Sequence, residues 1–317
     1  MKRRLFFKNI LLLSSFPFLK SNASIQYGKI SFQKTVKNVY ILDPLHKINN
    51  TLGQCSVHKL AFIEAKNGII VIDSGANYAV GKAILFQIAQ ISAKPIIAIL
   101  NTHHHSDHWF GNGAIKEKYP NVKIYAHKNF IDSAQEQYFN KYRKKRSYQK
   151  AKKVAFPNIF VKNNETLTID SETFFIQHPS FAHTDCDITI THINSNVIFL
   201  GDVALESSLG NFAKGSSILT NITFLEKVSK QKTYALYVAG HGSLGSKEKV
   251  IIPYLTYLTI IKDEVEKAYN EEKTLYELDA CKERVLERLN WEDGFNFPLS
   301  FVQSHIEFVY GELERKF

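Results

Sequence analysis

The stretch PIIAILNTHHHSDHWFGNG, residues 95–113, joins an apolar run directly to a cluster of imidazoles and one carboxylate. Side chains two apart on an extended chain point to the same side, so His103 and His105 face together, and Asp107 and His108 follow where the chain must turn. Imidazole and carboxylate are common zinc ligands. The alternative is a histidine-rich surface loop, but a buried strand that runs into the cluster places it at the end of a sheet. The stretch therefore predicts a site that can hold two metal ions.

The order His103, any residue, His105, any residue, Asp107, His108, followed by Gly111, resembles the signature of the metallo-β-lactamase superfamily. That resemblance implies an α+β fold, a four-layered αββα sandwich of two similar halves with a one- or two-metal site at one edge of the sheets. It most often implies hydrolysis. Within the superfamily, the chain is most similar to the glyoxalase II branch and to the periplasmic zinc metallohydrolases found with sulfur oxidation and quinoprotein systems.

Three further candidate ligands follow in the order that the family uses. His183 lies in AHTDCD, which resembles the family's His-Thr-x-Gly-Asp element except that Cys186 stands where glycine is usual. Asp202 follows a predicted apolar strand and resembles the family's bridging aspartate, and His241 follows another such strand. A carboxylate at the end of a buried strand is costly unless it is paired or bound to metal.

The resemblance thus implies two groups of three ligands and one shared carboxylate: His103, His105 and His183 on one zinc ion, Asp107, His108 and His241 on the other, and Asp202 between them. Asp107 would also orient the attacking hydroxide as the catalytic residue. The resemblance places Asp73 behind the ligands, where it would support a ligand loop. Its alternative role is to cap the helix that follows.

Two divalent ions about 3.5–4 Å apart can activate a shared water near neutral pH. We therefore predict a dinuclear zinc hydrolase that acts through a metal-bridging hydroxide on a small ester or thioester. A mononuclear iron persulfide dioxygenase is the alternative, because the motif does not fix the metal. Class B1 β-lactamases have cysteine at the position of Asp202, which disfavours that activity. A non-catalytic metal-binding member would lack ligands, and none is missing.

Residues 1–23 combine a basic start, a short apolar run and small residues near Ala23, which predicts a cleaved export signal. Arg3 and Arg4 resemble the twin-arginine signal, with an ordinary Sec signal as the alternative. The apolar run is shorter than the roughly 20 residues of a membrane span. These features predict a periplasmic protein whose hydrolase domain, residues 24–317, includes a helical segment at 246–317.

Removing residues 1–23 takes away five basic residues and no acidic one, so the formal net charge falls from +10 to +5. This composition favours a small-molecule substrate over nucleic acid. Residues 141–153 hold eight basic residues and no acidic one. They would form either a basic rim that attracts an anionic substrate or acidic lipid, or a solvated helix or loop. The three cysteines include no C-x-x-C pair, so no disulfide framework is predicted.

Apolar patterning predicts packed strands through residues 30–74, a helix over 78–93, and a second half that opens with a strand at 158–161. Apolar residues at steps of three and four predict helices over 246–317 that cover the sandwich and shape one wall of the cleft. The sequence leaves open whether they instead present a dimer face at Tyr254, Tyr257 and Ile261.

Overall fold

The computed structural model describes residues 30–44, 58–140, 153–206, 209–231, 233–242, 244–289 and 299–315. Three features singled out in the sequence lie outside the described residues: the export signal at 1–23, Cys55, and the basic segment apart from Lys153. In the described part of the chain, no helix is both long enough and apolar enough to cross a membrane.

The first sheet contains seven strands in sequential order, with antiparallel pairing from β1 to β4 and parallel pairing from β4 to β7. Its strands are β1 (Ile30–Lys34), β2 (Val39–Pro44), β3 (Ala61–Glu64), β4 (Ile69–Ile72), β5 (Ile96–Leu100), β6 (Lys123–His127) and β7 (Ile159–Val161). The predicted strands within residues 30–74 are confirmed. The parallel strands matter for the site because their carboxyl ends meet at one edge of the sheet.

The strand predicted at 158–161 does not open the second half, and that prediction is wrong. β7 pairs with β6 and so completes the first sheet. Asn158 holds this junction, because its backbone N–H donates to the Ile124 carbonyl and its Oδ1 accepts the Ile124 N–H at 2.8 Å. Three apolar residues alone could not indicate which of two sheets they would join.

The second sheet has six strands in the order β13-β12-β11-β10-β9-β8. Its strands are β8 (Glu165–Ile169), β9 (Glu172–Gln177), β10 (Thr189–His192), β11 (Val197–Phe199), β12 (Leu236–Val238) and β13 (Leu244–Gly245). β11 and β12 are parallel, and the other pairs are antiparallel. The parallel pair requires a crossover, which is α7 (Ile218–Lys230), a helix that the sequence patterns did not predict.

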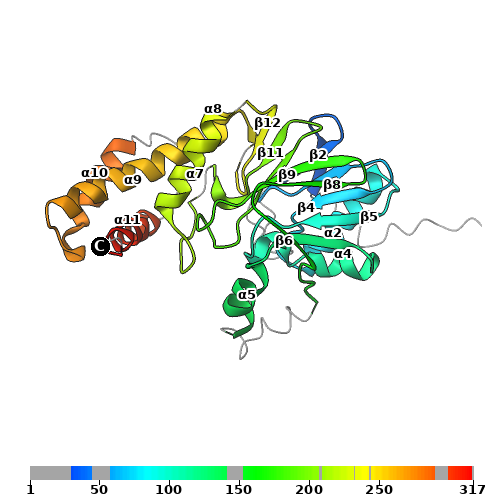
Figure 1. Cartoon of the computed structure of the whole chain (residues 1–317), viewed down its shortest axis with the longest axis horizontal. Helices are drawn as coiled ribbons and strands as arrows, with labels where there is room; N and C mark the ends of the chain where they lie inside the picture. The colour runs from blue at the N-terminus through cyan, green and yellow to red at the C-terminus, as the bar shows by residue number, and fades with distance from the viewer. Residues whose placement is uncertain are drawn as a thin grey trace, which may run out of the picture.

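Helices cover the outer faces of both sheets, as the αββα sandwich requires. Every residue of β4 is buried: Ile70 and Ile72 pack between the sheets, whereas Ile69 and Val71 pack under the first helical layer. That layer is formed by α2 (Tyr78–Ile91) and α4 (Asn112–Lys118), which contact each other. α7 and α8 (Lys247–Val250) cover the second sheet. The predicted four-layered fold is confirmed (Figure 1).

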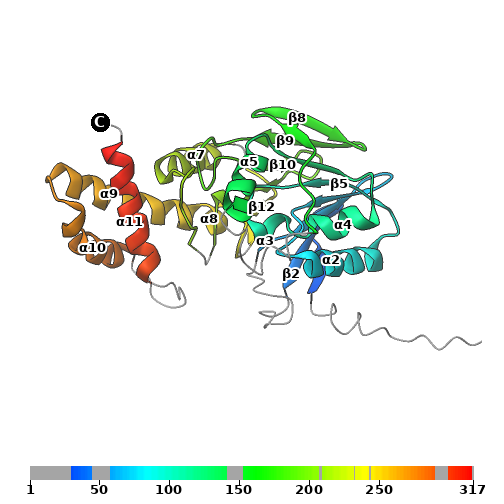
Figure 2. The same ribbon diagram turned by 90° about the horizontal axis from the view of Figure 1, so that it is seen from below.

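The C-terminal helices form an extension at the end of the molecule away from β2 and β4 (Figure 1). They are α9 (Ile252–Asn270), a short turn η3 (Leu275–Glu277), α10 (Asp279–Leu289) and α11 (Leu299–Glu314). α11 crosses α9 (Figure 2). Tyr254, Tyr257 and Ile261 are at most 3% exposed, so they pack inside the chain and do not form the alternative dimer face.

Candidate metal centre

The loop after β5 carries four of the seven candidate ligands. His103 and His105 precede α3 (Ser106–Trp109), a single helical turn that contains Asp107 and His108. Trp109 is fully buried, and its indole N–H donates to the His104 carbonyl at 2.7 Å. This hydrogen bond ties the turn back to the histidine run, so a short segment presents its side chains from a fixed backbone.

The second sheet supplies the other three candidates from loops at the same edge. His183 lies between β9 and β10. Asp202 lies in the short turn η2 (Gly201–Val203) directly after β11, and His241 follows β12. Glycine is required beside Asp202, because a Cβ atom on Gly240 would lie 1.9 Å from Asp202 Oδ1. The two halves of the sandwich therefore meet at this edge with their ligands facing one another.

The seven side chains form two groups whose possible ligand atoms each lie within 4.8 Å of one another. One group is His103, His105, His183 and Asp202, and the other is Asp107, His108 and His241. Asp202 also connects them: its carboxylate oxygens lie 3.4 Å from Nε2 of His183, and 3.2 Å and 3.4 Å from Nε2 of His108 and His241. The structure thus brings together all seven residues singled out in the sequence, with Asp202 in the group of His103, His105 and His183.

Asp73 lies behind both groups and is not a helix cap. Asn77 caps α2 instead, by accepting the Val80 N–H. The Asp73 carboxylate accepts hydrogen bonds from the Thr102 backbone N–H at 2.9 Å and the Thr102 hydroxyl at 2.7 Å, and it lies 2.8 Å from His108 Nδ1. Its backbone φ of 55° is tolerated by aspartate better than by most residues.

The buried nitrogen atoms of the centre fit a metal. Nε2 of His103, Nε2 of His108 and Oδ1 of Asp202 are buried and have no hydrogen-bond partner among the described residues. His103 Nδ1 can donate to the Thr102 hydroxyl at 3.1 Å, and His108 Nδ1 can donate to Asp73, which directs Nε2 of both rings into the centre. Unpartnered buried polar atoms are costly. Imidazole lone pairs beside ionised carboxylates are the donor set that zinc prefers.

Burial and the carboxylates shift the pKa values of the imidazoles in opposite directions. Burial lowers the pKa of His103 and His105 well below the usual value and that of His183 to about 4. For His241, burial acts in the same direction, but the carboxylates of Asp202 and Asp107 outweigh it and raise the pKa to about 9. For His108, burial also lowers the pKa, but the carboxylates of Asp202, Asp107 and Asp73 outweigh it and hold the pKa well above the usual value. Three imidazoles are therefore neutral and ready to ligate, whereas a metal must displace a proton at His108 and at His241.

The carboxylates themselves are ionised. Burial opposes this, but the neighbouring imidazoles hold the pKa of Asp107 and of Asp202 well below the usual value. The Asp202 side chain is 8% exposed, whereas the Asp107 side chain is 26% exposed. A buried negative charge needs a cation, and the more open Asp107 can also reach a water molecule or a substrate.

A cavity of 450 Å³ opens beside His105 and His183. Phe181 at its rim is 54% exposed, and Lys214 lies there with its Nζ 3.0 Å from Glu136 Oε1. The other lining groups are mostly polar: His104, Ser133, Gln137, Thr184, Asp185, Asn211, Ala213, Gly215 and Ser216. The cavity opens onto the candidate centre at His105 and His183.

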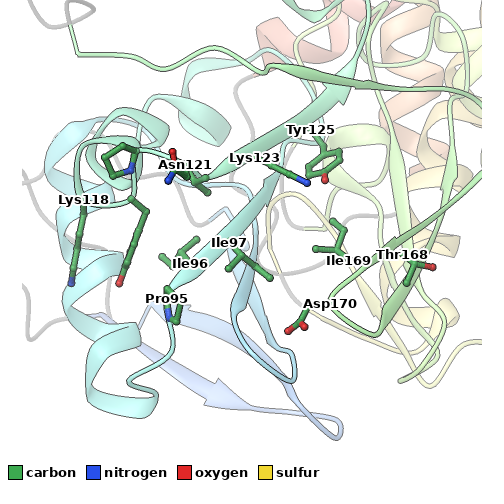
Figure 3. A pocket seen from close by; sticks show the side chains of 13 residues that line it. Pro95, Ile96, Ile97, Lys118, Asn121, Lys123, Tyr125, Thr168, Ile169 and Asp170 are labelled. Carbon is green, nitrogen blue, oxygen red and sulfur yellow. The ribbon is translucent and has the colours of Figure 1, made fainter.

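A second cavity, of 530 Å³, lies at the other end of the parallel strands (Figure 3). Ile96 and Lys123 line it from the starts of β5 and β6, and Ile169 and Asp170 line it from the end of β8. None of its lining residues is a candidate ligand. Of these two cavities, only the one beside His105 is lined by candidate ligands.

The sequence patterns did not reveal a third group, formed by His104, Asp185 and Cys186. The His104 ring lies edge to face against the His105 ring, with centroids 4.9 Å apart, but its nitrogen atoms contact Cys186 at 3.3 Å and Gln137 at 2.6 Å. Cys186 and Cys281 are buried and free. Each residue of the group adjoins a predicted ligand loop, and only the packing of one loop on the other brings them together.

A family model described as "Metallo-beta-lactamase superfamily" matches residues 57–241, which contain all seven candidate ligands. The chain belongs to the metallo-beta-lactamase superfamily. A hydroxyacylglutathione hydrolase of Prochlorococcus marinus (strain MIT 9312) is 32% identical over 122 residues, which cover 38% of this chain and 41% of that enzyme. The chain thus matches less than half the length of that relative.

Solved structures of metallo-beta-lactamase superfamily folds agree with the architecture. The stereoselective inverting sec-alkylsulfatase from Pseudomonas sp. has a TM-score of 0.64 at 15% identity and covers 89% of this chain and 50% of the sulfatase. A metallo-beta-lactamase from Pontibacter korlensis has a TM-score of 0.58 at 17% identity and covers 73% of this chain and 99% of that chain. At these identities the likeness establishes the fold alone.

Proposed function

We propose that the protein is an exported hydrolase that cleaves a small ester or thioester at a dinuclear zinc centre. The observation that carries the proposal is the position of Asp202, whose carboxylate lies 3.2–3.4 Å from imidazoles of both ligand groups. One carboxylate that reaches two clusters suits a pair of ions. His103, His105 and His183 would hold one ion, Asp107, His108 and His241 the other, and Asp202 would contact both.

The ions, when bound, would supply an activated water at neutral pH and polarise the scissile carbonyl. The chain's own contribution is placement and proton handling. Asp107 Oδ2, 3.2 Å from His241 Nε2, is the most exposed of the carboxylate groups and can accept a hydrogen bond from the attacking water. The substrate would enter through the cavity beside His105 and His183.

The proposed substrate class is supported by the relative named hydroxyacylglutathione hydrolase, an enzyme whose name denotes hydrolysis of a thioester of glutathione. It is also supported by the polar lining of the cavity, which suits a substrate with hydrogen-bonding groups. Export by the twin-arginine route, cleavage near Ala23 and a periplasmic location belong to the same proposal and rest on residues 1–23.

Metal content and activity measured on one sample test the proposal. The mature protein is purified from the periplasm, analysed for zinc and iron, and assayed with an acylglutathione thioester, an aryl ester, an alkyl sulfate and glutathione persulfide. We expect two zinc ions per chain and thioester or ester hydrolysis that Asp107→Asn reduces. One iron per chain with oxygen uptake on the persulfide would replace the proposal with a dioxygenase.

The export step has its own test, independent of the chemistry. Replacing Arg3 and Arg4 with lysine keeps the basic charge and removes only the paired guanidinium groups. We expect the precursor to accumulate in the cytoplasm, detected by fractionation and mass. Unchanged export of the double variant would instead assign the signal to the Sec route.

A further inference from the structure

His104, Asp185 and Cys186 form a group outside the centre described above. One possible ligand atom from each lies within 4.8 Å of the others, and the His104 Nδ1 to Cys186 Sγ distance is 3.3 Å. His104 is 8% exposed and Cys186 is fully buried. Buried cysteine is common as an apolar filler, but here an imidazole nitrogen and a carboxylate converge on the sulfur.

Side chains outside the group hold His104 and Asp185 in place. His104 Nε2 lies 2.6 Å from Gln137 Oε1, so it is the protonated nitrogen, and Nδ1 presents its lone pair to the sulfur. The Ser133 hydroxyl contacts both carboxylate oxygens of Asp185, at 2.8 Å and 2.9 Å. Metal ligands are normally oriented in this way, by hydrogen bonds on the side that faces away from the ion.

We propose that His104, Asp185 and Cys186 form a third metal site, for zinc or a divalent ion of similar preference. Thiolate, imidazole and carboxylate together are typical zinc ligands. Binding would form a sulfur–metal bond at Cys186 and release the thiol proton to solvent, with no change of oxidation state. His104 and Asp185 line the 450 Å³ cavity, which gives an ion access and leaves room for water as the fourth ligand.

The site would join the two halves of the sandwich. His104 belongs to the loop after β5 in the first sheet, and Asp185 and Cys186 belong to the loop between β9 and β10 in the second. These loops also carry His103, His105 and His183. An ion at the third site would therefore fix the relative position of the loops that hold the dinuclear centre, whatever reaction that centre catalyses.

Cobalt titration of the full-length mature protein tests this site by spectrum, without an activity assay. The chain has three cysteines, so Cys55→Ser with Cys281→Ser leaves Cys186 as the sole thiol. In this background we expect three Co²⁺ ions per chain and a thiolate-to-cobalt charge-transfer band in the near ultraviolet. The seven-ligand centre contains no sulfur and gives no such band. Adding Cys186→Ala should abolish the band and leave two ions.

A second pair of variants keeps the test valid if Cys186→Ala unfolds the protein. His104→Gln removes one ligand and should weaken binding of the Co²⁺ ion that gives the charge-transfer band by about tenfold or more. His127→Gln is the matched control, because His127 is also a buried imidazole at the sheet edge but lies outside the group, and it should leave the band unchanged. Saturation with Co²⁺ without a charge-transfer band in the sole-thiol background would overturn the proposal.

Discussion

His108 Nδ1 lies 2.8 Å from Asp73 Oδ2, and both side chains are at most 2% exposed. The same carboxylate accepts the Thr102 hydroxyl hydrogen, and that oxygen can in turn accept the His103 Nδ1 hydrogen. One buried aspartate thus orients an imidazole of each ligand group, His108 directly and His103 through Thr102. The Nε2 atoms of both rings are turned toward the centre as a result.

Replacing Asp73 with asparagine should weaken metal binding by about 10–100-fold, the usual cost of losing such an orienting partner. Asparagine also tolerates the left-handed backbone at this position, so the fold should persist. Competition with a chromophoric chelator measures the affinity. Asp170→Asn is the control, because Asp170 also has a positive φ, of 43°, but lies at the opposite end of the sheets. Equal affinities in the two variants would contradict the orienting role.

The Asp107→Ala and Asp202→Ala variants should differ in how many metal ions they retain. Asp202 contacts imidazoles of both groups, whereas Asp107 belongs only to the group with His108 and His241. We expect Asp107→Ala to keep one ion per chain and Asp202→Ala to lose both, as measured by elemental analysis after gel filtration. Retention of two ions in Asp202→Ala would remove it from the ligand set.

Gly240→Ala should disrupt the centre by steric displacement of Asp202. The added Cβ atom would lie 1.9 Å from Asp202 Oδ1 and 2.7 Å from the Gly201 carbonyl carbon. We expect metal affinity and the free energy of unfolding both to fall. Gly311→Ala in α11 is the control: among the described residues its Cβ would meet only Arg315 Nη1, at 3.7 Å, and alanine in a helix should stabilise by about 0.5–1 kcal/mol.

The contact between α11 and the loop before α7 should be lost in acid. His305 Nε2 lies 2.6 Å from the Gly210 carbonyl, and Nδ1 lies 2.7 Å from the Tyr257 hydroxyl. Burial lowers the pKa of His305 to about 4. Because the folded state favours the neutral ring, its stabilising effect is complete above the unfolded pKa near 6.5 and is lost as the pH falls toward 4.

Urea unfolding at pH 7 and pH 5 tests whether the stabilising effect of His305 is lost as the pH falls. The His305→Gln variant cannot titrate at this position. Between pH 7 and pH 5 we therefore expect its free energy of unfolding to fall by about 1–2 kcal/mol less than that of the wild type. His178, whose pKa burial also lowers, supplies the comparison in a His178→Gln variant, which should leave the α11 contact intact. An identical pH dependence in wild type and His305→Gln would show that the ring remains neutral when unfolded or titrates when folded.

The sequence predicted the part of the centre that depends on local pattern. A buried strand followed by a polar turn marked His103, Asp202 and His241, because the strand itself fixes where the next residue lies. Asp73 was ambiguous for the same reason: a carboxylate after a strand can cap a helix or support a ligand, and only the position of Asn77 decided between the two.

What the sequence did not predict depends on contacts between segments distant in the chain. The group of His104, Asp185 and Cys186 exists because one loop packs on another, and neither loop alone contains the signal. The three apolar residues of β7 carried no information about which sheet they would join. Tyr254 and Tyr257 followed a helical pattern that fits either a dimer face or an internal core, and their burial decided the matter.

Two backbone contacts close the sandwich at the metal edge: His58 bridges to His241, and the Lys59 N–H donates to the Gly240 carbonyl at 2.7 Å. During synthesis, the loop that holds His103 emerges from the ribosome long before His241, and the growing chain has only half of each ligand shell. Both groups of candidate ligands are complete only after these two backbone contacts have formed. A complete set of candidate ligands would therefore mark a chain that has folded at least as far as His241.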